Sequence, residues 1–322
     1  MNAFFFKPIY QERIWGGQNL ATHLGRTLPA GKKIGESWEL VDRPEACSDI
    51  LSGPGVKESS GLGKEAEGRH NLHTLWQEKR AEIFGTRAPD LARFPILIKL
   101  LDAQDNLSVQ VHPQSGQSGE SKTEMWYFLE TTPDAKIYVG LKKGVDRKKF
   151  EQAIGTPELP KLLYDLHPQQ SDAMFLPSGR VHAIGAGNLI LEIQQNSDTT
   201  YRIDDWGRVD EKGQPRALHR EEALASIRFT DHEPQFVQPH GERVLQCPFF
   251  SVERAFIYPG EYRVWTSDQS SFQYHFLAQG ELKIDDRTFK RGESWFVPAN
   301  AESYNLEPLG EGAELITVQW GK

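Results

Sequence analysis

The sequence has little cysteine, fewer basic than acidic residues, and no long apolar run. Cys47 and Cys247 are its only cysteines, which excludes a disulfide framework and a cysteine-based zinc site. A formal net charge of −8 argues against a general nucleic-acid binder, because affinity for the phosphate backbone needs a broad Lys/Arg surface. The apolar residues 4–6 meet Lys7 and Pro8 at once, so a signal peptide or membrane span is not expected there. We expect a cytoplasmic protein with no nucleic-acid or membrane partner, as a monomer or weak homodimer.

Aromatic residues, glycine and proline are plentiful by contrast. The 17 Phe, 9 Tyr and 8 Trp, with Gly 28 and Pro 19, favour aromatic strands separated by turns. Helical patterns are fewer and lie near residues 72–84, 146–154 and 220–228. Short strand-like runs recur at the spacing typical of a sandwich or barrel, at residues 36–41, 95–101, 107–111, 125–130, 136–141, 173–176 and 189–195. The chain is therefore predicted to be mainly β, with a few short helices.

A polar, proline-bearing segment at residues 231–242 lacks apolar periodicity and is the best linker candidate. It predicts a first domain at residues 1–235, which carries the helices. A second domain at residues 236–322 contains strand-like runs and no convincing helix. We interpret it as a small all-β module.

The two halves also share a local pattern, because residues 171–177 align with residues 292–298. Five residues after the shared proline, the first half has His182 and the second has Ser303. The second domain is therefore predicted to be a degenerate copy without metal ligands.

Four residues of the first half have the chemistry and spacing of a metal site. His182 ends a Pro-x-Gly-x-x-His turn, and Gln110 and His112 share one face of a strand because they are two residues apart. Glu124 opens a later strand, and a hairpin is expected to return it beside His112. Taken alone, His112 is more often an ordinary turn residue, and His182 is as readily a turn residue as a ligand. Their joint occurrence carries the prediction. The set suits Zn²⁺ with an open position, and Mn²⁺, Fe²⁺ and Co²⁺ are also compatible. Gln110 is either a ligand or a hydrogen-bond donor that supports the ligands.

Two lysines accompany this set. Lys122 lies two residues before Glu124, so we expect its ammonium on the metal-facing side, where an anionic ligand would bind. Lys99 lies in an apolar run and needs either solvent or a partner. Both alternatives for Lys99 remain open.

Charged residues downstream of His182 complete the candidates. Glu192 stands between apolar neighbours, where a carboxylate is costly unless it is paired or its pKa is raised, and a raised pKa would suit proton transfer. Asp198 and Arg202 flank a short turn-to-strand segment. Arg202 either binds an anion and stabilises negative charge, or forms a surface salt bridge with Asp204 or Asp205.

Seven ordered segments together resemble the type I mannose-6-phosphate isomerases of the cupin superfamily, in their short bacterial branch: residues 13–17, 35–39, 94–103, 107–113, 122–127, 177–184 and 197–202. The resemblance covers most of residues 4–230. It implies two cupin-type jelly-roll β-barrels, with a few short helices attached to the first. It also implies a zinc ion held by Gln110, His112, Glu124 and His182, and an essential arginine at Arg202.

The resemblance further implies an enzyme that interconverts mannose 6-phosphate and fructose 6-phosphate through a cis-enediol, so the expected partner is a sugar phosphate. Lys99, Lys122 and Arg202 are the expected substrate-binding residues. Glu192, then Asp198, are the candidates for proton transfer, with Arg202 and Lys122 as further catalytic residues. The alternatives are another cupin enzyme, namely a glucose-6-phosphate isomerase or a dioxygenase, and a non-catalytic sugar-binding regulatory protein.

Overall fold

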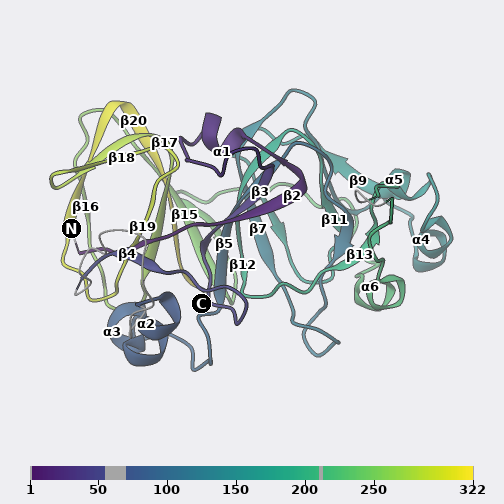
Figure 1. Ribbon diagram of the computed structural model, residues 1–322, viewed down its shortest axis with the longest axis horizontal. Helices are drawn as coiled ribbons and strands as arrows, with labels where there is room; N and C mark the ends of the chain where they lie inside the picture. The colour runs from purple at the N-terminus through teal and green to yellow at the C-terminus, as the bar shows by residue number, and fades with distance from the viewer. Residues whose placement is uncertain (1, 55–69, 210–212, 322) are drawn as a thin grey trace.

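Two β-rich halves lie side by side in the computed structural model, which describes residues 2–54, 70–209 and 213–321 (Figure 1). Strands account for far more of the chain than helices, so the mainly β prediction is confirmed. The sheets remain open at their edges over the described ranges. Within those ranges no helix has the length and hydrophobicity needed to cross a membrane.

The first half consists of two antiparallel sheets that face each other. The six-stranded sheet has the order β10-β7-β12-β5-β3-β2, with β2 at Ile9–Gly17, β3 at Ile34–Leu40, β5 at Ile96–Ala103, β7 at Glu124–Thr131, β10 at Ala173–Leu176 and β12 at Asn188–Gln195. The five-stranded sheet has the order β13-β6-β11-β8-β9, with β6 at Val109–Val111, β8 at Ile137–Leu141, β9 at Leu163–Leu166, β11 at His182–Ile184 and β13 at Tyr201–Asp204. The site described below lies between these sheets.

The six-stranded sheet is buried on both faces, which explains its nearly continuous apolar strands. On β7, Trp126 and Phe128 pack toward the five-stranded sheet, whereas Tyr127 and Leu129 belong to a core shared with the second half. The side-chain alternation of a strand separates these two environments. Tyr127 Oη also donates a hydrogen bond of 2.6 Å to Glu314 of the second half. This bond fixes β7, the strand that begins at Glu124, from the face opposite the site.

The second half is built on one seven-stranded sheet. Its main path is β14-β15-β20-β17-β18, while β16 pairs with β20 and β19 pairs with β17. The strands are β14 at Arg243–Gln246, β15 at Phe250–Ile257, β16 at Arg263–Trp265, β17 at Gln273–Ile284, β18 at Arg287–Lys290, β19 at Ser294–Val297 and β20 at Tyr304–Trp320. The N-terminal residues contribute here as well, because Phe4 bridges to Phe296 and Ala3 lies in this half's core. The domain boundary at residue 235 stays a prediction.

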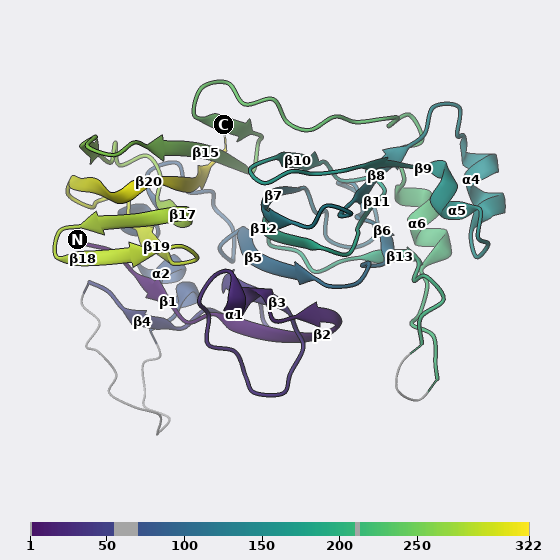
Figure 2. The ribbon, with the colours of Figure 1, turned by 90° about the horizontal axis from the view of Figure 1, so that it is seen from above.

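Short elements complete the fold. β1 at Phe5–Phe6 pairs with β4 at Ile50–Ser52. The helices are α1 at Asn19–Thr22, α2 at Leu72–Glu78, α3 at Arg80–Phe84, α4 at Arg147–Ala153, α5 at Leu159–Leu162 and α6 at Arg220–Ser226. Asp146 caps α4 as expected, since its side chain accepts a 2.8 Å hydrogen bond from Lys149 N. Helices α4, α5 and α6 gather at one end of the first half (Figures 1 and 2).

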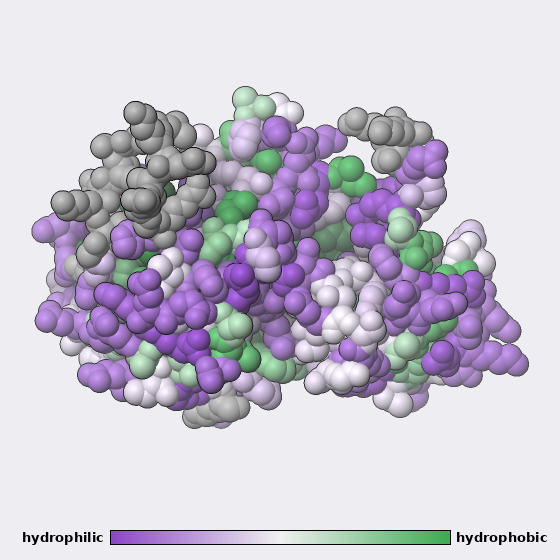
Figure 3. Space-filling view, turned by 60° about the horizontal axis from the view of Figure 1, so that its bottom comes forward, coloured by the Kyte–Doolittle hydropathy of each residue, from purple (hydrophilic) through white to green (hydrophobic). Residues whose placement is uncertain are grey.

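The predicted linker, residues 231–242, runs along the first half toward β14 (Figure 2). Backbone hydrogen bonds attach it there, from Val237 N to Ala173 O at 2.8 Å and from Leu141 N to Asp231 O at 3.0 Å. The linker is thus an extended connection that is hydrogen-bonded to the first half. On the molecular face in Figure 3, polar residues predominate and apolar residues form small separate patches.

Candidate metal centre

One row of the five-stranded sheet carries three of the predicted site residues. His182 on β11 is the register partner of Gln110 on β6, and Gln110 is also the register partner of Arg202 on β13. Register partners in antiparallel strands point to the same side of the sheet. His112 lies two residues beyond Gln110 and shares that face.

The six-stranded sheet supplies the opposite wall. Glu192 on β12 is in register with both Lys99 on β5 and Trp126 on β7, and Glu124 is in register with Gln194, two residues after Glu192. Glu124 and Glu192 therefore project from the same face. The expected hairpin is wrong, because β6 and β7 belong to different sheets. Glu124 reaches His112 by crossing the space between two facing sheets.

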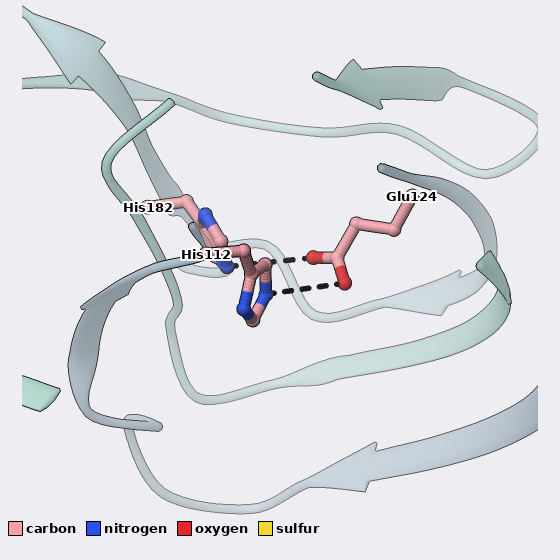
Figure 4. A group of neighbouring side chains, drawn as sticks. All are labelled: His112, Glu124 and His182. Atoms are coloured by element: carbon pink, nitrogen blue, oxygen red, sulfur yellow. Dashed lines mark ion pairs between the residues drawn. The ribbon is translucent and has the colours of Figure 1, made fainter. Parts of the chain in front are cut away.

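His112, Glu124 and His182 converge in the interior, as Figure 4 shows. His112 Nε2 lies 3.4 Å from Glu124 Oε2, and His182 Nε2 lies 3.4 Å from Glu124 Oε1. All three side chains are buried, and their ligand atoms lie within 4.8 Å of one another. Among the described residues, this group of histidine, cysteine and acidic side chains is the one close enough to hold a metal ion.

The outer nitrogen of each imidazole is tied to the backbone. His112 Nδ1 lies 2.9 Å from Thr199 O, and His182 Nδ1 lies 2.9 Å from Arg180 O. Because a carbonyl oxygen only accepts, each Nδ1 must carry the proton, which leaves the Nε2 lone pair facing Glu124. Burial lowers the pKa of both histidines, that of His182 to about 3, so the rings are neutral at pH 7.

Buried acceptor atoms of His112 and Glu124 indicate which kind of ligand this group would bind. His112 Nε2 and Glu124 Oε1 are buried without a hydrogen-bond donor among the described residues, and Glu124 Oε2 faces the Lys122 ammonium at 2.7 Å. Leaving a buried polar atom unsatisfied costs about 1 to 3 kcal/mol, more when the group is charged. Two neutral imidazoles and one carboxylate would satisfy a divalent cation of the Zn²⁺ type. The residues present therefore fit a metal ion.

Gln110 lies at the edge of this group. Its Nε2 is 3.2 Å from His182 Nε2, and rotating the amide would bring its oxygen to that position instead. Ligation and a supporting hydrogen bond are both compatible with this geometry. The ligand role of Gln110 stays a prediction.

Lys122 approaches the same carboxylate. Its Nζ lies 2.7 Å from Glu124 Oε2 and 3.8 Å from Glu192 Oε1. Burial alone would lower the pKa of Lys122, but Glu124 and Glu192 raise it, and the net direction is upward. Lys122 therefore stays charged at the metal-facing wall.

Lys99 has partners in the protein rather than solvent. Its Nζ lies 3.9 Å from both Glu36 Oε2 and Glu192 Oε1, and 4.9 Å from the centre of the Trp38 ring. Only 4% of the residue is exposed. Lys99 thus links two carboxylates along one wall of the site.

Glu192 combines burial with opposing charges. Burial, and then the nearby Glu124 carboxylate, raise its pKa to about 7, although Lys122 and Lys99 act in the opposite direction. Trp126 Nε1 donates a 3.0 Å hydrogen bond to its Oε2 and fixes the orientation of the carboxyl group. A group with a pKa near the working pH is suited to exchanging protons.

Arg202 does not form the surface salt bridge considered from the sequence. Asp205 instead pairs with Arg208 and Arg216, and over the described residues neither Asp204 nor Asp205 has an ion pair with Arg202. Arg202 Nη1 donates to Ala217 O at 2.9 Å, while its Nε is buried without an acceptor in the described chain.

These residues line a cleft of about 430 Å³ between the two sheets. Gln110, Lys99, Lys122, Glu192, Asp198 and Arg202 all contribute to it. The volume lies in the range of small-molecule sites. Of the charged side chains in its wall, five are basic and three are acidic, so the cleft attracts anions although the whole chain carries a formal net charge of −8.

Sequence reasoning assigned no role to four further residues of the site, namely Arg13, Glu36, Trp38 and Arg216. All but Arg216 stand within segments that carried the family resemblance. Glu36 and Trp38 contact Lys99, and Arg13 pairs with Glu36, but nothing in their spacing predicted these contacts. Nothing in the local sequence singled out Arg216, whose position depends on how the chain returns beside β13.

The chain is similar in sequence and in structure to mannose-6-phosphate isomerases. The family model for phosphomannose isomerase type I, catalytic domain, matches residues 4–139. Mannose-6-phosphate isomerase ManA of Bacillus subtilis is 33% identical, over 95% of this chain and 96% of the relative. A probable mannose-6-phosphate isomerase of the same organism, GmuF, is 34% identical over 78% of each chain. The crystal structure of mannose 6-phosphate isomerase from Bacillus subtilis superposes with a TM-score of 0.84 at 27% identity, covering 99% of both chains.

Proposed function

Because the chain belongs to the type I mannose-6-phosphate isomerases, we propose that it interconverts mannose 6-phosphate and fructose 6-phosphate in the cleft between its two sheets. The observation that carries this proposal is the convergence of His112, Glu124 and His182 near the buried carboxyl group of Glu192, whose pKa burial raises to about 7. An aldose–ketose isomerase needs both an electrophile for the sugar oxygens and a group that moves a proton between neighbouring carbons. The relatives compared above are named as mannose-6-phosphate isomerases, and no observation favours a dioxygenase, a glucose-6-phosphate isomerase or a non-catalytic binding protein.

We assign the metal as Zn²⁺, held by His112, Glu124 and His182 with Gln110 as the fourth ligand. With four protein ligands, a sugar oxygen would take a fifth position, and zinc in catalytic sites can expand to five-coordination. When bound, the cation polarises the sugar oxygens on which negative charge develops. The cytoplasmic location and the monomeric or weakly dimeric state stay predictions.

Glu192 is our candidate for the proton carrier. It would take the proton from C2 of the open-chain aldose and return it to C1 of the cis-enediol, which yields the ketose. Burial holds its pKa near neutrality, so both protonation states are accessible during turnover. Asp198, which also lines the cleft, is the second candidate.

Arg202 and Lys122 would stabilise the negative charge of the enediolate. Arg202 is in register with Gln110, and Lys122 Nζ lies beside the proposed ligand Glu124, so the two cations flank the reacting end of the cleft from different sheets. Lys99 would hold Glu192 and Glu36 in place and extend the positive wall toward the substrate.

Replacing Arg202 with alanine should lower kcat by about two to three orders of magnitude, the usual effect of losing one stabiliser of developing charge. The guanidinium is not a metal ligand, so the metal content per chain should remain unchanged. Steady-state kinetics together with metal analysis of one preparation would check this. A variant with near-normal turnover would refute the role of Arg202.

Chelation provides the direct test of the function. In a coupled assay that follows mannose 6-phosphate to fructose 6-phosphate, a chelator should abolish activity, and Zn²⁺ should restore it in proportion to the metal rebound. Adding Mn²⁺ or Co²⁺ to matched samples would rank the metals. An unchelated enzyme without isomerase activity, or a chelated enzyme with full activity, would contradict the proposal.

A further inference from the structure

The cleft extends beyond the metal-binding residues to the edges of both sheets. Next to Gln110 it is lined by Arg202 from β13, and farther out by Arg216 from the segment that follows β13 and by Arg13 from β2. Both β13 and β2 are terminal strands of their sheets. Arg202 thus lies between the metal-binding residues and Arg216, and Arg13 lines the same cleft from the edge of the facing sheet.

Arg216 lies farther from the metal-binding residues than Arg202 does. The segment around Ala217 runs beside β13, because His219 N donates to Arg202 O at 2.8 Å and Arg202 Nη1 donates to Ala217 O at 2.9 Å. Across the sheet, the spatial order is therefore His182, Gln110, Arg202 and then this segment. With neighbouring strands about 4.8 Å apart, three steps separate the backbone of this segment from that of His182 by about 14 Å.

The substrate of the proposed function carries its charge at the end opposite its reacting carbons. An open-chain hexose 6-phosphate presents C1 and C2 at one end and its phosphate at the other. If C1 and C2 lie at the metal, the phosphate must lie toward the outer end of the cleft. A guanidinium group is well suited to bind it, because its planar donors match phosphate oxygens.

The cations near the metal are already matched by carboxylates. Lys99 lies between Glu36 and Glu192, and Lys122 faces Glu124 and Glu192. Neither lysine is free to neutralise a phosphate dianion without losing these partners.

The outer arginines are less fully matched. Asp205 pairs with both Arg208 and Arg216, so one carboxylate faces two guanidinium groups, and Arg208 has a second partner in the exposed Asp105 at 3.6 Å. Asp205 holds only Nε and Nη2 of Arg216, and Nη1 has no acceptor in the described parts of the chain. Burial and then the positive charge of Arg216 lower the pKa of Arg202, while Asp205 acts in the opposite direction, so the Arg216 guanidinium is close enough to act on Arg202.

We propose that Arg216 binds the phosphate group of the sugar phosphate, with Arg13 adding positive charge from the facing sheet. This inference rests on the proposed function and adds the residues that distinguish a phosphorylated sugar from an unphosphorylated one. Arg13 is held by Glu36, to which its Nε donates at 3.0 Å, so it contributes mainly through its charge. Arg216 would donate from its Nη1 to a phosphate oxygen.

The test compares Arg216→Gln with Arg208→Gln. Both arginines pair with Asp205, but Arg208 turns to Asn106 O and lies outside the lining of the cleft. In Arg216→Gln, KM for mannose 6-phosphate and the inhibition constant of inorganic phosphate should both rise about 10- to 100-fold, as expected for one charge-assisted hydrogen bond. The kcat should stay within about threefold. The inhibition constant of unphosphorylated mannose should not change, and Arg208→Gln should match the wild type in all four values.

Two further variants keep the test decisive. Arg216→Lys should recover part of the phosphate affinity, and Arg13→Gln should weaken it less than Arg216→Gln does. An unchanged inhibition constant for phosphate in folded Arg216→Gln, or an equal weakening of phosphate and mannose, would overturn the assignment. So would a full loss of phosphate affinity in Arg208→Gln. A wild-type enzyme without isomerase activity would instead refute the proposed function.

Discussion

The His182→Ala variant should lose its bound metal and at least about three orders of magnitude in kcat together. His182 presents a neutral Nε2 lone pair 3.4 Å from Glu124, with its Nδ1 held by Arg180 O, so alanine removes a preformed ligand. Lewis-acid stabilisation by a metal is worth several kcal/mol, and each 1.36 kcal/mol corresponds to a tenfold change in rate. Metal analysis per chain and steady-state kinetics on the same sample would measure both losses.

The second half offers a matched control for this experiment in His275. Like His182, it is fully buried, and burial lowers its pKa to about 3. Its two nitrogens are occupied by Thr317 Oγ1 at 3.0 Å and Tyr304 Oη at 2.8 Å, which leaves no lone pair for a metal. His275→Ala should therefore lower thermal stability but leave metal content unchanged. Full metal occupancy in folded His182→Ala would remove this residue from the ligand set.

Glu192→Gln should lower kcat by about two to four orders of magnitude, the contribution of a positioned acid–base group. Glutamine has nearly the same shape, and its amide oxygen can still accept the hydrogen bond from Trp126 Nε1, so the variant isolates the loss of proton transfer. Metal content should be retained, since Glu192 is not a ligand in the proposed set. Exchange of the C2 proton with deuterated solvent should fall in parallel with kcat.

The pH dependence follows from the direction of the pKa shift of Glu192. Burial, and then Glu124, raise this pKa to about 7, so the carboxylate that accepts the proton forms as the pH rises through that region. The rate from aldose to ketose should therefore rise with pH and level off once Glu192 is ionised. A cation bound at Glu124 favours the carboxylate form, which moves the rise to pH 7 or below.

Comparing the pH profiles of Glu192→Gln and Asp198→Asn would show which carboxyl group causes the rise of the rate with pH. Glu192→Gln should abolish it, whereas Asp198→Asn should retain it with a smaller loss of kcat. If Asp198→Asn removed the rise and Glu192→Gln kept it, Asp198 would be the proton carrier.

The strands of the six-stranded sheet could be predicted well because burial on both faces leaves a continuous apolar signal. Residues 173–176 were predicted as a strand and form β10, and residues 189–195 form most of β12. By contrast, β11 was not predicted as a strand, and β13 only as the strand end of the segment between Asp198 and Arg202, since both are too short to show alternation. Their place in the fold comes from pairing with β6 and β8.

The mistaken hairpin has a physical explanation. A loop between two strands is compatible with pairing in one sheet or with crossing to a facing sheet, and residue order alone does not distinguish them. Both arrangements bring His112 close to Glu124, so the ligand prediction did not depend on the choice. Which sheet forms the wall with Lys122 and Glu192 did depend on this choice.

The sequence by itself determined the chemistry of the candidate residues and their local spacing. Gln110 and His112 share a face because a strand repeats every two residues, and Lys122 precedes Glu124 by the same interval. These relations are local, so they survive any error in topology. The mainly β class and the family resemblance depend on such local patterns as well.

Only the tertiary structure decided which residues meet across the cleft. Pairing of β11, β6 and β13 places His182, Gln110 and Arg202 in one row, and the facing sheet gives Lys99 its two carboxylate partners. The position of Arg216 depends on the chain returning beside β13. These contacts form because apolar faces far apart in the sequence are buried against each other, and burial of that kind is a property of the whole chain.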